Sequence, residues 1–488
     1  MSLTADQYPQ KPPQRKSLFR SSLLSFLSQS SGERSPPVAP PASEESSFML
    51  PAKRSLVNFG WISASASTIS QPAMQTAAYS APYPSSSQCS LSHGNSTSGG
   101  QRIKGSLGRV WGKLSSMQLM NSCRIDSLVS GSTRPSVADE AAASEAAEEV
   151  ENSQNEIIQL VRKDLHGRDL KIEDFVFFGT VGTGSFGRVC IVDIKGSQSW
   201  YPAMALKILS KHKVVTMKQV EHVKDERRIL SQISHPFIVN LLASFQDEKR
   251  LFLLMEYVNG GELFSYLRKQ TFMPTDQARL YAAEITLAFQ YLHERSIVYR
   301  DLKPENLLID AQGHIKITDF GFAKVVTGRT WTLCGTHEYL APESITRRGH
   351  GLQVDWWALG ILLFEMLAGR PPFVDDTPLG IYKKIIAGKI EFPPLFDCAA
   401  KSLVKRLLIH EPNKRYGCLR DGAEDVKNHK FFRGIDWNLC YQRKIRPLYK
   451  PNIRGPRDSS MFDTYAESTE SSAPVIDAAT QQALFHNF

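Results

Sequence analysis

The sequence has no long hydrophobic run. None of its stretches reaches the roughly 18 consecutive apolar residues of a membrane-spanning helix, and the nearest candidate, Trp356 to Leu367, is too short. The N-terminus lacks a secretory core, and Ser2 rather than a glycine follows Met1, so the N-myristoylation pattern is absent. We therefore expect neither secretion nor a transmembrane segment, and a cytoplasmic location with the nucleus as an alternative.

Cysteine is also scarce. The seven cysteines are an odd number without paired spacing, which favours a reducing compartment over a disulfide scaffold or a zinc site. The net charge of +9 is a modest basic excess spread along the chain. We therefore predict no nucleic-acid binding.

The first 150 residues lack the periodicity of helices and strands. Residues 1–150 are dense in Ser, Ala, Pro and Gln, a composition typical of disorder. Two pieces inside them, residues 16–27 and 102–124, mix basic with apolar side chains. Each is either a membrane-surface or partner helix or simply part of a solvated tail.

Regular patterns begin with helical spacing over residues 155–165, and strand patterns follow from residue 175. The ranges 175–181, 188–194 and 204–208 read as three strands of an antiparallel sheet, and 251–257 as a further buried strand. Helical spacing marks 220–233, 278–293 and 355–367, and 314–318 alternates as a short strand. The pattern predicts a small β-rich lobe followed by a larger helical lobe, with a nucleotide in the cleft between them.

A glycine-rich segment joins the first two predicted strands. A G-x-G-x-x-G pattern alone is weak, because dinucleotide-binding folds use the same letters where a strand opens into a helix. Here a strand follows the glycines, so they cap a hairpin whose N–H groups can approach ATP phosphates. The residues expected to do so are Gly182, Thr183, Gly184, Ser185, Phe186 and Gly187.

Four further signatures follow in the order of a protein kinase: Ala205-Leu206-Lys207, Tyr299 to Asn306, Asp319-Phe320-Gly321 and Ala341-Pro342-Glu343. Lys207 would hold the α- and β-phosphates, with Glu226 as its partner. Asp301 is placed to take the proton of the attacking hydroxyl, and Lys303 to neutralise charge on the γ-phosphate. Asn306 and Asp319 offer hard oxygen ligands for Mg²⁺. With this set intact, a catalytically dead scaffold is disfavoured.

The chain resembles the AGC family of protein kinases, and within it the catalytic subunits of cyclic-AMP-dependent kinases. The resemblance is carried by Thr330 to Thr336, by Phe320 to Lys324, by Phe462-Asp463-Thr464-Tyr465 and by the C-terminal Phe485-His486-Asn487-Phe488. It implies an α+β, bilobal protein kinase fold. The division is residues 1–150 as a disordered extension, 151–174 as a leading helix and linker, 175–432 as the kinase domain and 433–488 as an AGC tail.

The resemblance also implies roles for individual residues. Thr332 matches the activation-loop phosphorylation site, whose phosphate Arg300, Lys324 and His222 could gather once an upstream kinase has acted. The remaining nucleotide contacts would come from Val189, Ala205, Glu256, Val258 and Glu262. Glu262, Glu305 and Glu365 would bind arginines before the phosphoacceptor, and Thr336, Leu333 and Leu340 would contact the residues at and after it.

Three alternatives for function remain. The first is an ATP- and Mg²⁺-dependent Ser/Thr kinase with an Arg-Arg-x-Ser/Thr preference, inhibited by a separate cyclic-AMP-binding regulatory subunit. The second is another AGC kinase, cyclic-GMP-dependent-like or constitutively active; the third is a kinase-fold scaffold. Two departures from the family pattern are His337, where a proline is expected, and the absence of a tryptophan in the leading helix. Ser127, with Arg124 three residues before it, is a candidate autophosphorylation site.

Overall fold

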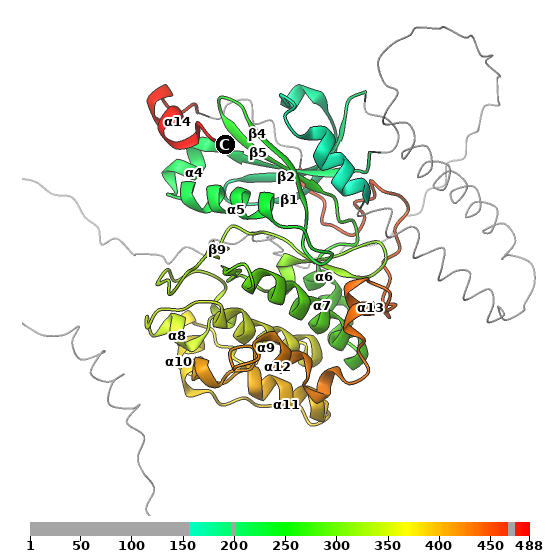
Figure 1. Ribbon diagram of the computed structural model, residues 1–488, viewed down its shortest axis with the longest axis vertical. Helices are drawn as coiled ribbons and strands as arrows, with labels where there is room; N and C mark the ends of the chain where they lie inside the picture. The colour runs from blue at the N-terminus through cyan, green and yellow to red at the C-terminus, as the bar shows by residue number, and fades with distance from the viewer. Residues whose placement is uncertain (1–155, 197–200, 467–473) are drawn as a thin grey trace, which may run out of the picture. The chain divides into compact units, whose positions relative to one another are not determined.

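The computed structural model describes residues 156–196, 201–466 and 474–488 (Figure 1). The segments 16–27 and 102–124 and the candidate phosphosite Ser127 lie outside the described residues. Within the described part of the chain, no helix combines the length and the apolar character needed to span a bilayer.

The first lobe is built on a five-stranded antiparallel sheet in the order β1-β2-β3-β5-β4. The first three strands confirm the prediction. Apolar residues alternate along a strand with one buried face and form a continuous run along a strand with two buried faces. The strands are β1 (Phe175–Thr183), β2 (Gly187–Ile194), β3 (Met204–Ser210), β4 (Leu241–Gln246) and β5 (Arg250–Glu256), with helices α4 (Lys211–Thr216) and α5 (Val220–Gln232) between β3 and β4.

The second lobe is mainly helical. Helices α7 and α9 confirm the predicted ranges within a few residues. The helices are α6 (Leu263–Gln270), α7 (Thr275–His293), α8 (Pro342–Ile345), α9 (Gln353–Ala368), α10 (Pro378–Ala387), α11 (Cys398–Leu407), α12 (Ala423–Lys427) and α13 (Trp437–Tyr441), and two small sheets pair β6 (Ile297–Val298) with β9 (Lys324–Val325) and β7 (Leu307–Ile309) with β8 (Ile315–Ile317).

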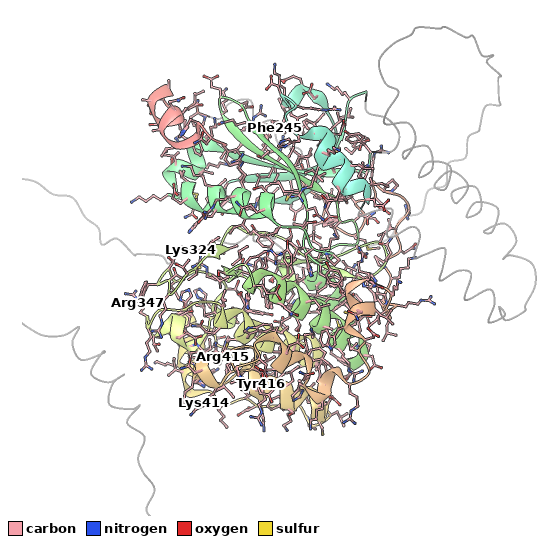
Figure 2. The ribbon with its side chains drawn as sticks, viewed as in Figure 1. Phe245, Lys324, Arg347, Lys414, Arg415 and Tyr416 are labelled. Atoms are coloured by element: carbon pink, nitrogen blue, oxygen red, sulfur yellow. The ribbon has the colours of Figure 1, made fainter. Side chains whose placement is uncertain are left out.

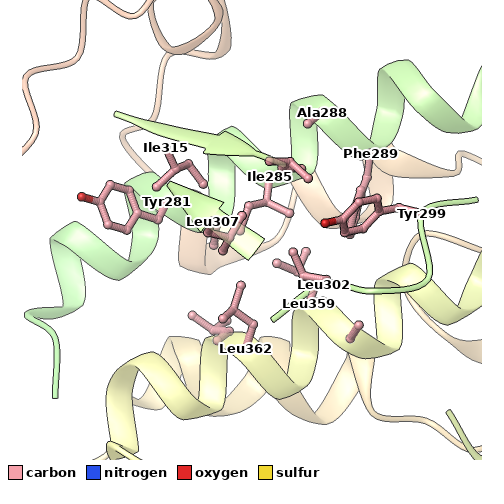
Figure 3. Close-up of a cluster of buried hydrophobic side chains, with 14 of the residues drawn as sticks. Tyr281, Ile285, Ala288, Phe289, Tyr299, Leu302, Leu307, Ile315, Leu359 and Leu362 are labelled. Carbon is pink, nitrogen blue, oxygen red and sulfur yellow. The ribbon is translucent and has the colours of Figure 1, made fainter. Parts of the chain in front are cut away.

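The core of the helical lobe lies where α7, α9 and the β7–β8 hairpin meet (Figure 3). Ile285 and Phe289 of α7, Leu307 of β7, and Leu359 and Leu362 of α9 are fully buried there. Each such side chain contributes roughly 1.5–3 kcal/mol relative to an exposed one. This core fixes the hairpin and the loop before it, which carry the catalytic signature.

Helices near both ends of the described chain pack on the small lobe. A helix over residues 156–165 buries Val161 and Leu165 in the same cluster as Phe175 of β1. At the other end, α14 (Ala478–Phe485) buries Phe485 against Leu209 and Val214. Aromatic stacking supports the sheet itself, since the centroids of the Phe245 and Phe175 rings lie 5.5 Å apart. Figure 2 labels Phe245 in this lobe.

Candidate functional site

The glycine-rich segment forms a tight hairpin. Strand β1 ends at Thr183, β2 begins at Gly187, and the Gly184 N–H donates to the Gly187 carbonyl at 2.8 Å. A β-carbon at Gly187 would lie 1.7 Å from the Ile208 carbonyl oxygen, so only glycine fits this position. A strand rather than a helix follows the loop, which excludes the dinucleotide-fold interpretation.

Beneath this loop, Lys207 joins the two lobes. Its ammonium lies 2.6 Å from Glu226 Oε1 in α5 and 3.2 Å from Asp319 Oδ1 after β8. Burial alone would lower the pKa of Lys207, but the two carboxylates outweigh it and hold the pKa above its ordinary value. Burial raises the pKa of Glu226 despite its partner.

A cavity opens between the glycine-rich loop and Asp319. Ser185 and Phe186 of the loop line it together with Lys207 and Glu226, and Asp319 and Gly321 line it from the other lobe. The loop thus lies over the ion-paired lysine. Part of the set that the sequence assigned to phosphate and metal binding, Ser185, Phe186, Lys207 and Asp319, therefore faces one cavity.

The loop before β7 brings three buried polar side chains together. Lys303 Nζ lies 3.1 Å from Asp301 Oδ2, and Asn306 Nδ2 donates to the same oxygen at 2.7 Å. Burial raises the pKa of Asp301 to about 6, although Lys303 opposes the shift. Asp301 is therefore mostly a carboxylate at neutral pH, close enough to titration to accept a proton.

Asp355 holds this loop in place. Its carboxylate accepts from the Tyr299 N–H at 2.9 Å and the Arg300 N–H at 2.8 Å, and His293 Nε2 lies 2.8 Å away. Asp355 is fully buried in the first turn of α9. Helical periodicity predicts this position only as the start of a helix; the signal in the sequence is an ionisable residue directly before Trp356-Trp357.

The oxygen ligands for a metal are few. The described residues contain no group of three or more His, Cys, Asp or Glu side chains that could hold an ion by themselves. Asn306 donates from its amide nitrogen to Asp301, which leaves its amide oxygen available as a metal ligand, with the Asp319 carboxylate as the second candidate. Two such ligands fit Mg²⁺, which is usually held by one or two side chains plus phosphates and water.

Three basic groups gather near the activation segment. Arg300 Nε donates to the Phe322 carbonyl at 2.7 Å, while its Nη1 is buried without a hydrogen-bond partner. Burial and the charges of Arg300 and Lys324 lower the pKa of His222, whose ring contacts that of Phe322. Thr332 itself is exposed. The structure thus brings together the three basic side chains that the sequence assigned to a phosphate on Thr332, with His222 neutral while that phosphate is absent.

Three carboxylates form an acidic cluster, defined as Glu262, Glu305 and Glu365. Burial raises the pKa of Glu262 to about 7, with Glu305 and Asp463 adding to the shift. Burial also raises the pKa of Glu365 to about 7, although a 2.5 Å hydrogen bond from Tyr339 opposes it. Asp463 of the tail, absent from the predicted site, thus adds negative charge to this cluster.

The segment after Thr332 lies against the catalytic aspartate. Thr336, Leu340 and Asp301 line one small cavity, while Leu333 remains 39% exposed. His337, the departure from the family pattern, turns its Nδ1 to the Tyr382 hydroxyl of α10 at 2.7 Å. The structure therefore gives this segment a polar contact with α10.

Of the remaining residues expected to contact the nucleotide, some are packed apolar side chains and one is a carboxylate with partners inside the protein. Val189 packs in a cluster with Val181, and Tyr257 and the tail residue Phe462 border it. Ala205 and Val258 are also buried. The Glu256 side chain instead turns to Asn240 and Lys316, so its own carboxylate is engaged within the protein.

Comparison with known proteins gives consistent matches. The protein kinase domain family matches residues 175–432. The chain is 51% identical over 318 residues to the human cAMP-dependent protein kinase catalytic subunit PRKX, covering 65% of this chain and 87% of that one.

Two other organisms supply similar relatives. A cAMP-dependent protein kinase catalytic subunit of Dictyostelium discoideum is 56% identical over 61% of this chain and 45% of its own length. The cAMP-dependent protein kinase type 3 of Saccharomyces cerevisiae is 47% identical over 62% and 76%. The chain therefore belongs to the protein kinase family, and it is an AGC-type serine/threonine kinase similar to the catalytic subunits of cyclic-AMP-dependent protein kinase.

Proposed function

We propose that this kinase phosphorylates basic Arg-Arg-x-Ser/Thr sequences, using ATP and Mg²⁺, and that a separate cyclic-AMP-binding regulatory subunit inhibits it. The acidic cluster is the observation that carries the substrate preference. Glu262, Glu305 and Glu365 are coupled electrostatically, and a guanidinium fork pairs bidentately with such carboxylates.

The roles of the buried residues follow from their placement. Asp301 orients the substrate hydroxyl and accepts its proton, because it is mostly ionised at neutral pH. Lys303, 3.1 Å from Asp301, balances charge that develops on the transferred phosphoryl group. Lys207 would hold the α- and β-phosphates of ATP, and Asn306 and Asp319 would hold Mg²⁺, which would supply positive charge to neutralise the phosphates.

Activation depends on a phosphate on Thr332, added by an upstream kinase or by a second copy of this one. The unpartnered Nη1 of Arg300 offers a donor for it. Because Arg300 follows Tyr299 and precedes Asp301, ordering Arg300 also orders the catalytic loop. His222 lies one helical turn before Glu226 in α5, which would pass the effect to Lys207.

Control by a regulatory subunit is supported by the relatives, whose names describe cyclic-AMP-dependent enzymes. Trp331, 64% exposed beside Thr332, is an apolar side chain that a partner could cover. Other AGC kinases under different control are the second candidate.

Peptide phosphorylation by the purified protein tests the proposal. We expect activity on an Arg-Arg-Ala-Ser-Leu peptide that a cyclic-AMP-dependent regulatory subunit blocks and cyclic AMP restores. Activity that the subunit does not block would favour the second candidate. Absence of activity with Thr332 phosphorylated would refute the catalytic proposal and favour a scaffold.

A further inference from the structure

The β7–β8 hairpin holds the segment that connects the two lobes. After β5 ends at Glu256, the chain crosses to α6 through residues 257–262. At the far end of this crossing, Gly260 N–H donates to the Ile309 carbonyl and Ile309 N–H donates to the Gly261 carbonyl, both at 2.8 Å. Strand β7 therefore fixes the crossing where it enters the helical lobe.

A buried ion pair fixes the other end. Lys316 of β8 donates to Glu256 Oε1 at 2.8 Å, and the two side chains are 5% and 12% exposed. The same oxygen accepts from the N–H and the side-chain amide of Asn240 at 2.7 and 2.8 Å. One carboxylate oxygen thus gathers three donors at the point where the chain leaves the sheet.

The anchor on the β8 side is itself rigid. Ile317 N–H donates to the Phe237 carbonyl, and Val239 N–H donates to the Ile317 carbonyl, both at 2.9 Å. Strand β8 is therefore hydrogen-bonded on one side to β7 and on the other to the segment before β4. Because the backbone of β8 is held on both sides, Lys316 has a fixed position and can determine where the Glu256 side chain lies.

Strand β8 also leads to the metal-binding end of the site. Asp319, three residues after Lys316, reaches Lys207 at 3.2 Å. The Lys316–Glu256 pair consequently links the strand that carries Asp319 to the residue that precedes Tyr257 and Val258 at the nucleobase side. A change in this pair would alter the spacing between the two ends of the nucleotide site.

We propose that Lys316 is a positioning residue for nucleotide binding, acting through Glu256 to fix the lobe-connecting segment relative to Asp319. This inference rests on the proposed ATP-binding function of the cleft. Lys316 touches no reacting atom; its effect is on the geometry of the nucleotide site. Because a buried charge pair loses most of its benefit when one partner is removed, replacement of Lys316 weakens nucleotide binding.

The test compares Lys316→Met and Lys316→Arg with wild type in the full chain. We expect Lys316→Met to raise both the KM for ATP and the Kd of a non-hydrolysable ATP analogue with Mg²⁺ about fivefold or more. The kcat at saturating ATP should change less than about twofold, and Lys316→Arg should restore part of the affinity. Lys389→Met is the matched control, since Lys389 forms an exposed pair with Glu391 at 2.9 Å.

An unchanged Kd, a fall in kcat alone, or an equal shift in Lys389→Met would overturn the inference. If Lys316→Met does not fold, the double variant Lys316→Met/Glu256→Gln removes the uncompensated charge and keeps an acceptor for Asn240. It should fold, show weakened analogue binding and exchange the amide hydrogens of residues 257–262 faster than wild type. A wild-type protein that binds the analogue but phosphorylates no peptide would refute the proposed function and leave this binding test intact.

Discussion

The raised pKa values of Glu262 and Glu365, both about 7, make substrate recognition dependent on pH. Only the ionised carboxylates attract arginine, and lowering the pH through 7 protonates them. We therefore expect the KM for an Arg-Arg peptide to rise as pH falls from about 8 to 6. Initial rates across this range, at saturating ATP, measure the effect.

A peptide without arginines provides the control, because its KM should stay nearly constant over the same interval. Glu365→Gln should raise the KM for the Arg-Arg peptide by about tenfold, the effect of losing roughly 1.5 kcal/mol of a charge-assisted hydrogen bond. Glu391→Gln removes an exposed carboxylate paired with Lys389 and should leave this KM unaltered. A pH-independent KM would contradict the assignment of the acidic cluster to arginine.

Thr332 offers a second prediction about a single residue. If its phosphate satisfies Arg300 Nη1, Thr332→Ala should lower kcat by about tenfold or more, since one charge-assisted hydrogen bond is worth roughly 1.5 kcal/mol. Thr332→Ser retains a hydroxyl and should keep most of the activity after treatment with an activating kinase. Equal rates for the alanine and serine variants would exclude a role for this phosphate.

At the scale of elements, helix α9 holds the catalytic loop through Asp355, which accepts hydrogen bonds from two backbone N–H groups of that loop. Asp355→Asn would leave either the Tyr299 or the Arg300 N–H facing an amide donor. We expect it to destabilise the protein by about 1–3 kcal/mol and to lower kcat. Thermal unfolding and peptide kinetics measure the two effects.

Asp436→Asn serves as the comparison for this variant. Asp436 also accepts from backbone N–H groups, at the start of α13, but asparagine is an equally good cap there. Its Tm and kcat should therefore remain close to those of wild type. A similar loss in both variants would indicate that Asp355 contributes no more than an ordinary helix cap.

Periodicity predicted the elements well because their apolar residues follow the faces that become buried. The alternating residues of β1 and β2 and the continuous apolar run of α9 are examples. The motifs also singled out Ser185, Lys207 and Asp319, which line one cavity in the structure. Neither periodicity nor motifs predict the structural roles of Lys316 and Asp355. The buried ion pair of Lys316 and the hydrogen bonds that Asp355 accepts depend on partners about 60 residues away in the sequence.

For the whole chain, the N-terminal extension carries a candidate substrate sequence. Ser127 follows Arg124 by three residues and precedes Leu128, which matches the proposed substrate preference in part. We expect phosphate on Ser127 after incubation of the full chain with ATP and Mg²⁺, detected by mass spectrometry. A mixture of Lys207→Met protein with active Ser127→Ala protein distinguishes transfer between copies, because only the former carries the acceptor.

An Arg-Arg peptide in the same tube is the control. If that peptide is phosphorylated while Ser127 stays unmodified after prolonged incubation, Ser127 is not a substrate of its own kinase.

The contact between Lys207 and Asp319, at 3.2 Å, makes the affinity for ATP depend on the concentration of magnesium. Before any nucleotide arrives, Asp319 already serves as a counter-ion to the lysine that must receive the phosphates. Nucleotide that arrives without a divalent cation would place its own negative charge beside this carboxylate. The affinity for ATP should therefore rise with the concentration of free magnesium, and cellular magnesium would then set how much of the enzyme is loaded.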